Sequence, residues 1–193
     1  MKQASELWCD GGLVLQNPSP FGGTWAWVAL DGKGEKINGD SGIVTPTYAN
    51  LPTVSNNLSE LLAAVKALQW VPEGWRGKLF TDSRVTLLRL THGSGFNGIP
   101  QFLRTQALEL RRSRKAEVVL VGGHPTKKEL ALGYRGWWGR DPETSLVLPG
   151  SAGRIPVSKW NAWCDKKCKL RAREFIERNE ATIKLLERKV GTC

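Results

Sequence analysis

Four acidic residues stand at positions where a carboxylate is unusual. Asp10 lies inside a strand-like segment and is followed by two glycines. Glu60 lies near the start of an apolar helical pattern, and Asp82 closes a short strand-like run. Asp165 lies near the start of the last helical segment. Taken singly, each has a structural explanation: Asp82 would cap the helix that follows it, and Glu60 and Asp165 would favour the positive ends of their helices.

Taken together, the four carboxylates indicate metal-dependent chemistry. Carboxylates that converge at one end of a sheet repel one another unless cations are bound between them. Hard oxygen ligands favour Mg²⁺, with Mn²⁺ as a substitute, and two such ions about 3.5–4 Å apart are the apparatus for in-line cleavage of a phosphodiester. One ion would activate the attacking water and the other would stabilise the leaving oxygen.

The charge distribution points to a polyanionic partner. The chain has 193 residues, with 28 Lys+Arg against 18 Asp+Glu and a net charge of +10. The excess lies in residues 103–128 and 159–189, each of which carries a net charge of +5. Two basic faces suit nucleic acid, while a merely solubilising surface is the alternative. Basic faces and a two-metal carboxylate cluster together predict a nuclease.

Length and composition exclude several classes of protein. A chain of 193 residues suits one compact domain, and 40% hydrophobic with 24% charged residues excludes a disordered or fibrous chain. No apolar run approaches the roughly 20 residues that span a bilayer. The first six residues contain no apolar run of a secretory signal. Four cysteines do not make a disulfide framework, so we expect reduced thiols and a cytoplasmic location. Because no apolar run is long enough to span a bilayer, we also expect no membrane association.

The segments that must position the carboxylates form a mixed pattern of strands and helices. Five strands are predicted, at residues 5–15, 24–30, 35–44, 77–82 and 117–123. The first three form a hairpin meander, and the last is predicted to be buried because its apolar run is continuous. Helices are predicted at residues 58–68, 83–90 and 100–114, and as one long helix from residue 159. This order is typical of a mixed sheet with helices packed on it.

We expect a single domain over residues 1–193 with two additions. Residues 125–158 are rich in turn signals and form an insertion or lid, and residues 176–193 extend the last helix. Trp137 and Trp138 in the insertion stand among basic residues. They would pack onto the body of the domain or stack on a nucleic-acid strand.

Five short motifs follow one another along the chain in a telling order. They are Asp10-Gly-Gly with Asn17-Pro, Ser55-Asn-Asn-Leu-Ser-Glu60, Thr81-Asp-Ser83, Gly123-His124 and Asn161-Ala-Trp-Cys-Asp165. In this order the chain resembles type 1 ribonuclease H over most of residues 5–124 and 159–175. The resemblance implies a ribonuclease H-like α/β fold, with a five-stranded mixed sheet and helices on both faces. It also implies an endonuclease that cuts the RNA strand of RNA–DNA hybrids and leaves 5′-phosphates.

The resemblance further implies the roles of the acidic residues and of one histidine. Asp10 would bridge two Mg²⁺ ions, Glu60 and Asp82 would hold the leaving-group metal, and Asp165 would hold the nucleophile-side metal. His124 would assist proton transfer or product departure. From His124 to Asp165 is 41 positions, longer than in many members of the family, and displacement of the histidine by this insertion is the alternative.

The same resemblance implies which residues contact the hybrid. The matching positions are Gly11, Gly12, Asn17, Ser55, Asn56 and Asn57. Helix capping is the alternative for Ser55, Asn56 and Asn57. The sequence has no obvious separate basic protrusion of the kind that some members of the family use to bind DNA, and the helix around Arg111, Arg112 and Arg114 would take its place.

Other functions remain open at this point. A ribonuclease H-like fold with the same metals could serve a Holliday junction resolvase or a DNA exonuclease, and a non-catalytic nucleic-acid-binding module is a third possibility. The Asn56-Asn57 pair and the glycines after Asp10 favour the hybrid enzyme. Four intact carboxylates argue against a silent module. Zinc is not expected, because Cys164 and Cys168 make only one closely spaced pair, and we expect a monomer.

Overall fold

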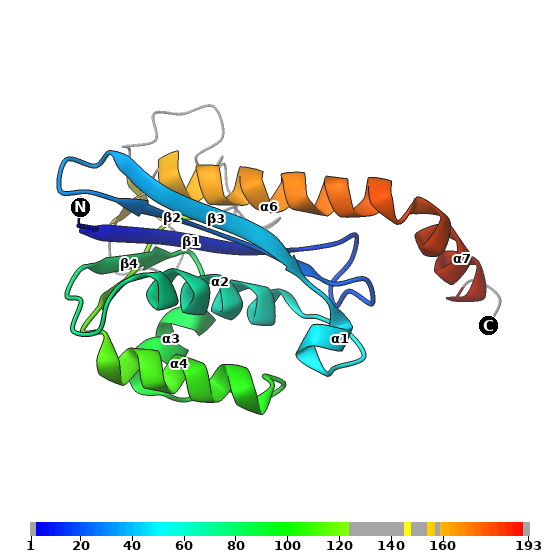
Figure 1. Ribbon diagram of the computed structural model, residues 1–193, viewed down its shortest axis with the longest axis horizontal. Coiled ribbons are helices and arrows are strands. Elements are labelled where there is room, and N and C mark those ends of the chain that lie inside the picture. Colours follow the sequence, from blue (N-terminus) through cyan, green and yellow to red (C-terminus); the bar gives the residue numbers. More distant parts are fainter. Residues whose placement is uncertain (1–2, 124–144, 148–153, 157–158, 191–193) are drawn as a thin grey trace.

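One mixed sheet of five strands lies at the centre of the molecule (Figure 1). The computed structural model describes residues 3–123, 145–147, 154–156 and 159–190. The strands are β1 (Glu6–Leu13), β2 (Gly23–Leu30), β3 (Lys36–Val44), β4 (Lys78–Thr81) and β5 (Glu117–Leu120), in the spatial order β3-β2-β1-β4-β5. The first three strands pair antiparallel as the predicted meander, whereas β4 runs parallel to both β1 and β5.

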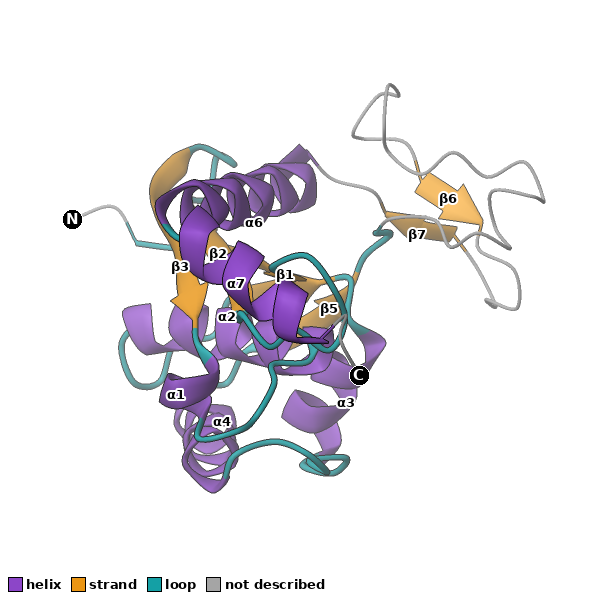
Figure 2. Ribbon diagram, turned by 90° about the vertical axis from the view of Figure 1, so that its right-hand side faces the viewer, coloured by secondary structure: helices purple, strands orange, loops and turns teal. Residues whose placement is uncertain are grey.

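Helices cover both faces of this sheet (Figure 2). On one face, α2 (Asn56–Trp70) packs across β1 and β2, and α3 (Arg84–His92), α4 (Gln101–Ser113) and the short α1 (Pro46–Ala49) lie on the same side. On the other face, α6 (Lys159–Arg178) crosses β1, β2 and β3 and is followed by α7 (Glu180–Val190). The predicted five-stranded mixed sheet with helices on both faces is confirmed.

The hydrophobic core explains why α2 forms where its pattern predicts. Its apolar stripe, Leu58, Leu61, Leu62, Val65 and Leu68, is at most 2% exposed. This stripe packs against the α2 face of the sheet as part of the larger of two apolar clusters. The smaller cluster fills the opposite face, where Trp8 of β1 meets the buried thiols of α6. The central strands are therefore covered on both sides.

The prediction that residues 117–123 form a buried strand is wrong in one respect. β5 is the last strand of the sheet, and Val118, Val119 and Leu120 are only half-buried. A continuous apolar run predicts a strand covered on both faces, but it does not show whether that strand lies at the centre or at an edge of the sheet.

The predicted single helix from residue 159 is also wrong, because it breaks at Asn179 between α6 and α7. The Asn179 side chain donates from Nδ2 to the carbonyl oxygen of Phe175 at 2.8 Å, and its own N–H lies 3.1 Å from that oxygen and 3.2 Å from the oxygen of Ile176. An asparagine that competes for the helix's own carbonyl groups interrupts the regular ladder.

The insertion is described only in part. Within residues 125–158, β6 (Ser145–Val147) and β7 (Arg154–Pro156) pair antiparallel. The predictions for Trp137 and Trp138 lie outside the described residues. Among the helices of the described ranges, none has the length and apolar character needed to cross a membrane.

Candidate active site

Glycine residues bring Asp10 of β1 close to Glu60 of α2. Gly11 lies directly beneath α2, so that a methyl group on Gly11 would stand 2.2 Å from the backbone nitrogen of Glu60 and 2.4 Å from the carbonyl carbon of Ser59. On Gly23 of β2, a methyl group would stand 2.0 Å from the Oγ of Ser59. The absence of side chains at these positions lets the first half of α2 rest on the backbone of β1 and β2.

Asp82 reaches the same region from the end of β4. Ser83, the next residue, caps α3 by accepting a hydrogen bond from the N–H of Thr86 at 3.1 Å. Its hydroxyl also donates to Oε2 of Glu60 at 2.5 Å, which ties the start of α3 to α2. On the other side, Asn161 of α6 donates from Nδ2 to Oδ2 of Asp82 at 3.1 Å. Asp82 therefore lies between α2 and α6.

Asp165 approaches from the opposite face of the sheet on α6. Its residue is only 7% exposed, and its carboxylate accepts a hydrogen bond from Nζ of Lys169 at 2.8 Å. Two thiols hold this part of α6 against β1. Cys164 donates to the carbonyl oxygen of Trp8 at 3.5 Å, and Cys168 donates to that of Asp10 at 3.4 Å.

The negative charges of three carboxylates act on the fourth, Asp10. Burial raises the pKa of Asp10 well above its usual value, and the negative charges of Asp82, Asp165 and Glu60 raise it further, in that order. Burial also raises the pKa of Glu60 from 4.5 to about 7, although the hydrogen bond from Ser83 opposes the shift. The structure therefore brings together all four of the acidic residues that the sequence singles out.

The simpler structural explanations do not account for these carboxylates. The cap of α3 is Ser83 rather than Asp82. Glu60 and Asp165 both lie beyond the first turn of their helices, where the favourable effect of the helix dipole is concentrated. Helix capping therefore does not explain Asp82, and the helix dipole does not explain Glu60 or Asp165.

The donor set has the chemistry of a Mg²⁺ or Mn²⁺ site. It consists of hard carboxylate oxygens, and a cation between them would relieve the repulsion that raises the pKa of Asp10. In the described part of the chain, no three carboxylate, imidazole or thiol groups are gathered as the ligands of one ion. Each carboxylate instead accepts a hydrogen bond from the protein, from Gly11, Ser83, Asn161 or Lys169.

The residues predicted to contact the substrate gather around the start of α2. Oδ1 of Asn17 accepts a hydrogen bond from the N–H of Asn56 at 3.3 Å, and Nδ2 of Asn56 donates to Oε1 of Glu60 at 2.7 Å. Ser55 caps α2 through the N–H of Leu58, and the side chain of Asn57 is exposed. The capping alternative thus holds for Ser55, while Asn56 and Asn57 are not caps.

The two glycines after Asp10 face the helices on opposite sides of the sheet. Gly11 faces α2, whereas Gly12 faces α6, where a methyl group would lie 3.3 Å from Cβ of Cys168 and 2.7 Å from Oγ1 of Thr24. The prediction for His124 lies outside the described residues.

Arg89 and Asn161 belong to the site but were missed as functional residues. Arg89 is 3% exposed and donates to the carbonyl oxygens of Asn57 and Gly95, each at 2.9 Å. Its positive charge opposes the rise in the pKa of Glu60. One signal was available: an arginine beside Leu90 on the inner face of a short helix must find partners in the interior.

The arginines expected to replace a basic protrusion have structural partners. Arg111 donates from Nε and Nη2 to the carbonyl oxygen of Thr91, and Arg114 donates from Nε to that of Val71 at 3.3 Å. Both lie near the C-terminal end of α4, which leads into the start of β5. β4 and β5 run parallel, so the start of β5 lies beside the start of β4, whereas Asp82 follows the end of β4. These arginines therefore lie at the opposite end of the sheet from the carboxylates.

The three cysteines of the described residues are core residues. Cys9, Cys164 and Cys168 are free and buried, and burial raises the pKa of each thiol. Buried thiols with raised pKa values are poor metal ligands and poor nucleophiles.

The raised pKa of Glu60 predicts how stability depends on pH without divalent cations. Between pH 4.5 and about 7 the folded protein keeps a proton on Glu60 that the unfolded chain has lost. The contribution of Glu60 to the free energy of unfolding should therefore be fully present below pH 4.5 and be lost, by up to about 3 kcal/mol, as the pH rises through about 7. Urea denaturation in EDTA between pH 4 and 8 measures this decrease.

Glu60→Gln is the matched control, because it keeps the size of the side chain and removes the titration. The difference in free energy of unfolding between wild type and Glu60→Gln should change with pH in that window and flatten when Mg²⁺ is added. A difference that stays constant from pH 4 to 8 in EDTA would show that Glu60 ionises normally.

Comparisons with known proteins support the resemblance to ribonuclease H. No family model matches the chain. A curated ribonuclease H from Hahella chejuensis is 33% identical over 79 residues, which is 41% of this chain and 45% of that protein, so the match spans less than half of the relative's length.

Among solved structures, the N-terminal RNase H domain of a Mycobacterium tuberculosis protein, determined as a fusion with maltose-binding protein, aligns with a TM-score of 0.54 and 10% identity over 91% of this chain and 99% of that one. RNase H1 from Halobacterium salinarum aligns with a TM-score of 0.46 and 20% identity over 60% of this chain and 84% of that one. The fold of the chain is ribonuclease H-like.

Proposed function

We propose that this protein is a metal-dependent endoribonuclease that hydrolyses the RNA strand of RNA–DNA hybrids. The main support is the convergence of Glu60, Asp82 and Asp165 on a buried Asp10 within a ribonuclease H-like fold. Buried carboxylates that repel one another cost stability, and a cation-dependent reaction is the simplest function that such an arrangement serves.

The four carboxylates would hold two Mg²⁺ ions, for which Mn²⁺ can substitute. Asp10 would be shared between the ions, Glu60 and Asp82 would hold the one at the leaving group, and Asp165 would hold the one at the nucleophile. When bound, the ions supply the Lewis acidity that activates water and stabilises the leaving oxygen, and the RNA product would carry a 5′-phosphate.

Neighbouring residues of the chain orient these carboxylates. Ser83 and Asn56 each donate a hydrogen bond to Glu60, one to each oxygen. Asn161 fixes one oxygen of Asp82, and Lys169 offsets the charge of Asp165. Orientation of this kind reduces the rearrangement that ion binding requires.

The start of α2 would contact the hybrid. Asn17, Asn56 and the exposed Asn57 lie beside Glu60. Gly11 and Gly12 pack against α2 and α6, so they would contribute backbone groups to the contact. A contact to a 2′-hydroxyl distinguishes RNA from DNA at such a surface. Amide side chains can donate to and accept from that hydroxyl group.

One assay tests the proposed function against its alternatives. Labelled RNA–DNA hybrid, double-stranded RNA, duplex DNA and a four-way DNA junction are incubated side by side with Mg²⁺ or Mn²⁺. We expect cleavage of the RNA strand of the hybrid only, with 5′-phosphate ends. Preferential cleavage of the junction or of duplex DNA would replace the proposal with a DNA nuclease, and no cleavage of any substrate would support a binding module.

His124→Ala should slow the turnover of hybrid by about 10–10³-fold, less than the loss of a carboxylate. The reason is that His124 follows Gly123, which packs against Asp82 so closely that a methyl group on it would stand 2.2 Å from Oδ2 of Asp82. Steady-state turnover at saturating hybrid measures the effect, with His92→Ala, at an exposed position, as the control. An unchanged turnover number would mean that the insertion has displaced the histidine.

We also propose that the protein works in a reducing compartment such as the cytoplasm, which is supported by the free, buried Cys9, Cys164 and Cys168. The monomeric state and the absence of zinc stay predictions. Size-exclusion chromatography with light scattering and metal analysis of the purified protein test them.

A further inference from the structure

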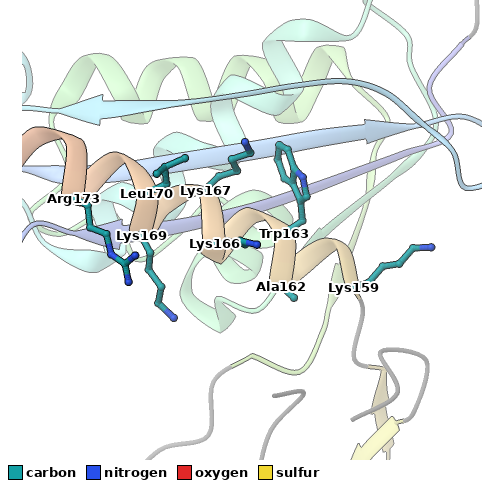
Figure 3. A pocket seen from close by; sticks show the side chains of 8 residues that line it. All are labelled: Lys159, Ala162, Trp163, Lys166, Lys167, Lys169, Leu170 and Arg173. Atoms are coloured by element: carbon teal, nitrogen blue, oxygen red, sulfur yellow. The ribbon is translucent and has the colours of Figure 1, made fainter. Parts of the chain in front are cut away.

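The outer side of α6 carries a concentration of positive charge. Five cations, Lys159, Lys166, Lys167, Lys169 and Arg173, line a shallow depression of about 680 Å³ together with Trp163 and Leu170 (Figure 3). We call these five cations the α6 basic face. Lys166 and Arg173 are exposed, and neither forms an ion pair with a described residue.

Trp163 organises one side of the α6 basic face. The ammonium group of Lys167 lies 5.3 Å from the centre of its ring, and that of Lys36 from β3 lies 4.3 Å from it. Cation–π contacts of this kind hold both ammonium groups at the surface rather than neutralising them. The ring itself packs on β3, where a methyl group on Gly39 would stand 3.3 Å from it.

The α6 basic face is continuous with the candidate active site. A second depression, of about 250 Å³, adjoins Asp165 and Gly12 and shares Lys169 and Arg173 with the first. Lys169 also contacts Asp165 directly at 2.8 Å. A path of positive charge therefore leads from the carboxylate cluster across the outside of α6.

The length of the face suits a nucleic-acid backbone. From Lys159 to Arg173 the helix rises about 21 Å at 1.5 Å per residue, which matches about six nucleotides at 3.4 Å each along a duplex. The acidic side chain of Glu174 lies outside this lining and is paired with Arg171 at 2.7 Å.

We propose that the α6 basic face binds phosphates of the nucleic-acid substrate beyond the scissile bond. This inference rests on the proposed function and gives α6 the role that the sequence suggested for Arg111, Arg112 and Arg114. Charge complementarity and continuity with Asp165 favour nucleic acid over the alternative of an anionic membrane surface, since a membrane contact has no need of a path to the carboxylates.

The test compares two triple variants with the same change in net charge. The first is Lys166→Gln, Lys167→Gln, Arg173→Gln. The control is Lys33→Gln, Arg76→Gln, Lys115→Gln, three exposed positions outside α6. The Kd of a fluorescent RNA–DNA hybrid is measured by anisotropy in EDTA over a range of salt concentrations, and circular dichroism checks the fold.

We expect the α6 variant to raise the Kd by about tenfold or more and to reduce the slope of log Kd against log salt by about 2–3, because each lost phosphate contact releases about one fewer counterion. The control should keep the wild-type slope. Parallel lines for the α6 variant and wild type, or equal flattening in the control, would overturn the inference. Should the triple variant not fold, the double variant Lys166→Gln, Arg173→Gln should still reduce the slope by about 2.

Two further measurements separate the alternatives. Sedimentation with phosphatidylserine vesicles tests the membrane surface: loss of vesicle binding by the α6 variant with unchanged hybrid binding would overturn the inference. If the wild-type protein cleaves the hybrid but the α6 variant and wild type give parallel plots of log Kd against log salt, the inference is rejected and the proposed function is kept. Absence of cleavage together with an α6-dependent salt slope rejects the proposed function and supports the α6 basic face as a nucleic-acid contact.

Discussion

Asp10→Asn is expected to reduce the rate of hybrid hydrolysis by about 10³-fold or more while the protein stays folded. Asp10 is the carboxylate whose pKa responds to Asp82, Asp165 and Glu60, which places it at the centre of the cluster. Asparagine keeps the size of the side chain and one oxygen, but it removes the charge that a shared metal ligand must supply. A loss of several kcal/mol of transition-state stabilisation corresponds to this decrease in rate.

The same variant should be more stable than wild type when no divalent cation is present. In the wild type, burial and three neighbouring charges oppose the ionisation of Asp10. Asparagine has no charge to bury, so the melting temperature in EDTA should rise by a few degrees. Added Mg²⁺ should raise the melting temperature of wild type and have less effect on Asp10→Asn, because ligands stabilise the state that binds them.

Asp40→Asn is the matched control for both measurements. Asp40 lies on β3 with an exposed side chain, and asparagine can still accept the hydrogen bond that its Oδ1 receives from Ser41. It should leave the rate and the melting temperature unchanged. Full activity of Asp10→Asn on hybrid would contradict the assignment of the cluster as the active site.

Local sequence patterns were enough to locate most of the elements and the four carboxylates. The apolar spacing from Leu58 to Leu68 defines the buried side of α2, and Ser55 before it is the observed cap. The motif order implied that Asp10, Glu60, Asp82 and Asp165 meet. Each of these features depends on residues close in sequence or on the resemblance to a known family.

Features that depend on contacts between distant segments could not be predicted. The partners of Arg89 are carbonyl groups 32 residues before it and six residues after it. The bond from Asn161 to Asp82 spans 79 residues, and the position of β5 at the edge depends on what packs beside it. Periodicity does not encode such distances, so the residues that orient the carboxylates emerged only from the structure.

The contact between Gly11 and α2 is a feature of this kind, and its loss should be severe. A methyl group on Gly11 would meet backbone atoms of Ser59 and Glu60 rather than the flexible end of a side chain. The helix would have to move away from β1, and Glu60 would move with it. Gly11→Ala should therefore lower the free energy of unfolding by about 1–3 kcal/mol, the usual cost of overpacking.

Activity should decrease even where Gly11→Ala remains folded. A displacement of about 1 Å in a catalytic group can cost about 10²-fold in rate, and we expect a loss of that size in the single-turnover rate at saturating hybrid and Mg²⁺. Saturating hybrid separates this effect from weaker substrate binding. The distinction is needed because Gly11 is also predicted to contact the hybrid. Circular dichroism and urea denaturation at the assay temperature establish the folded fraction.

Gly32→Ala is the control for Gly11→Ala, because a methyl group there meets no atom within 4 Å. It should retain the wild-type rate and stability. If Gly11→Ala loses stability but keeps its single-turnover rate, the contact between Gly11 and α2 is not what places Glu60 for the reaction. If both quantities decrease together, the close approach of β1 and α2 is what places Glu60 beside Asp10.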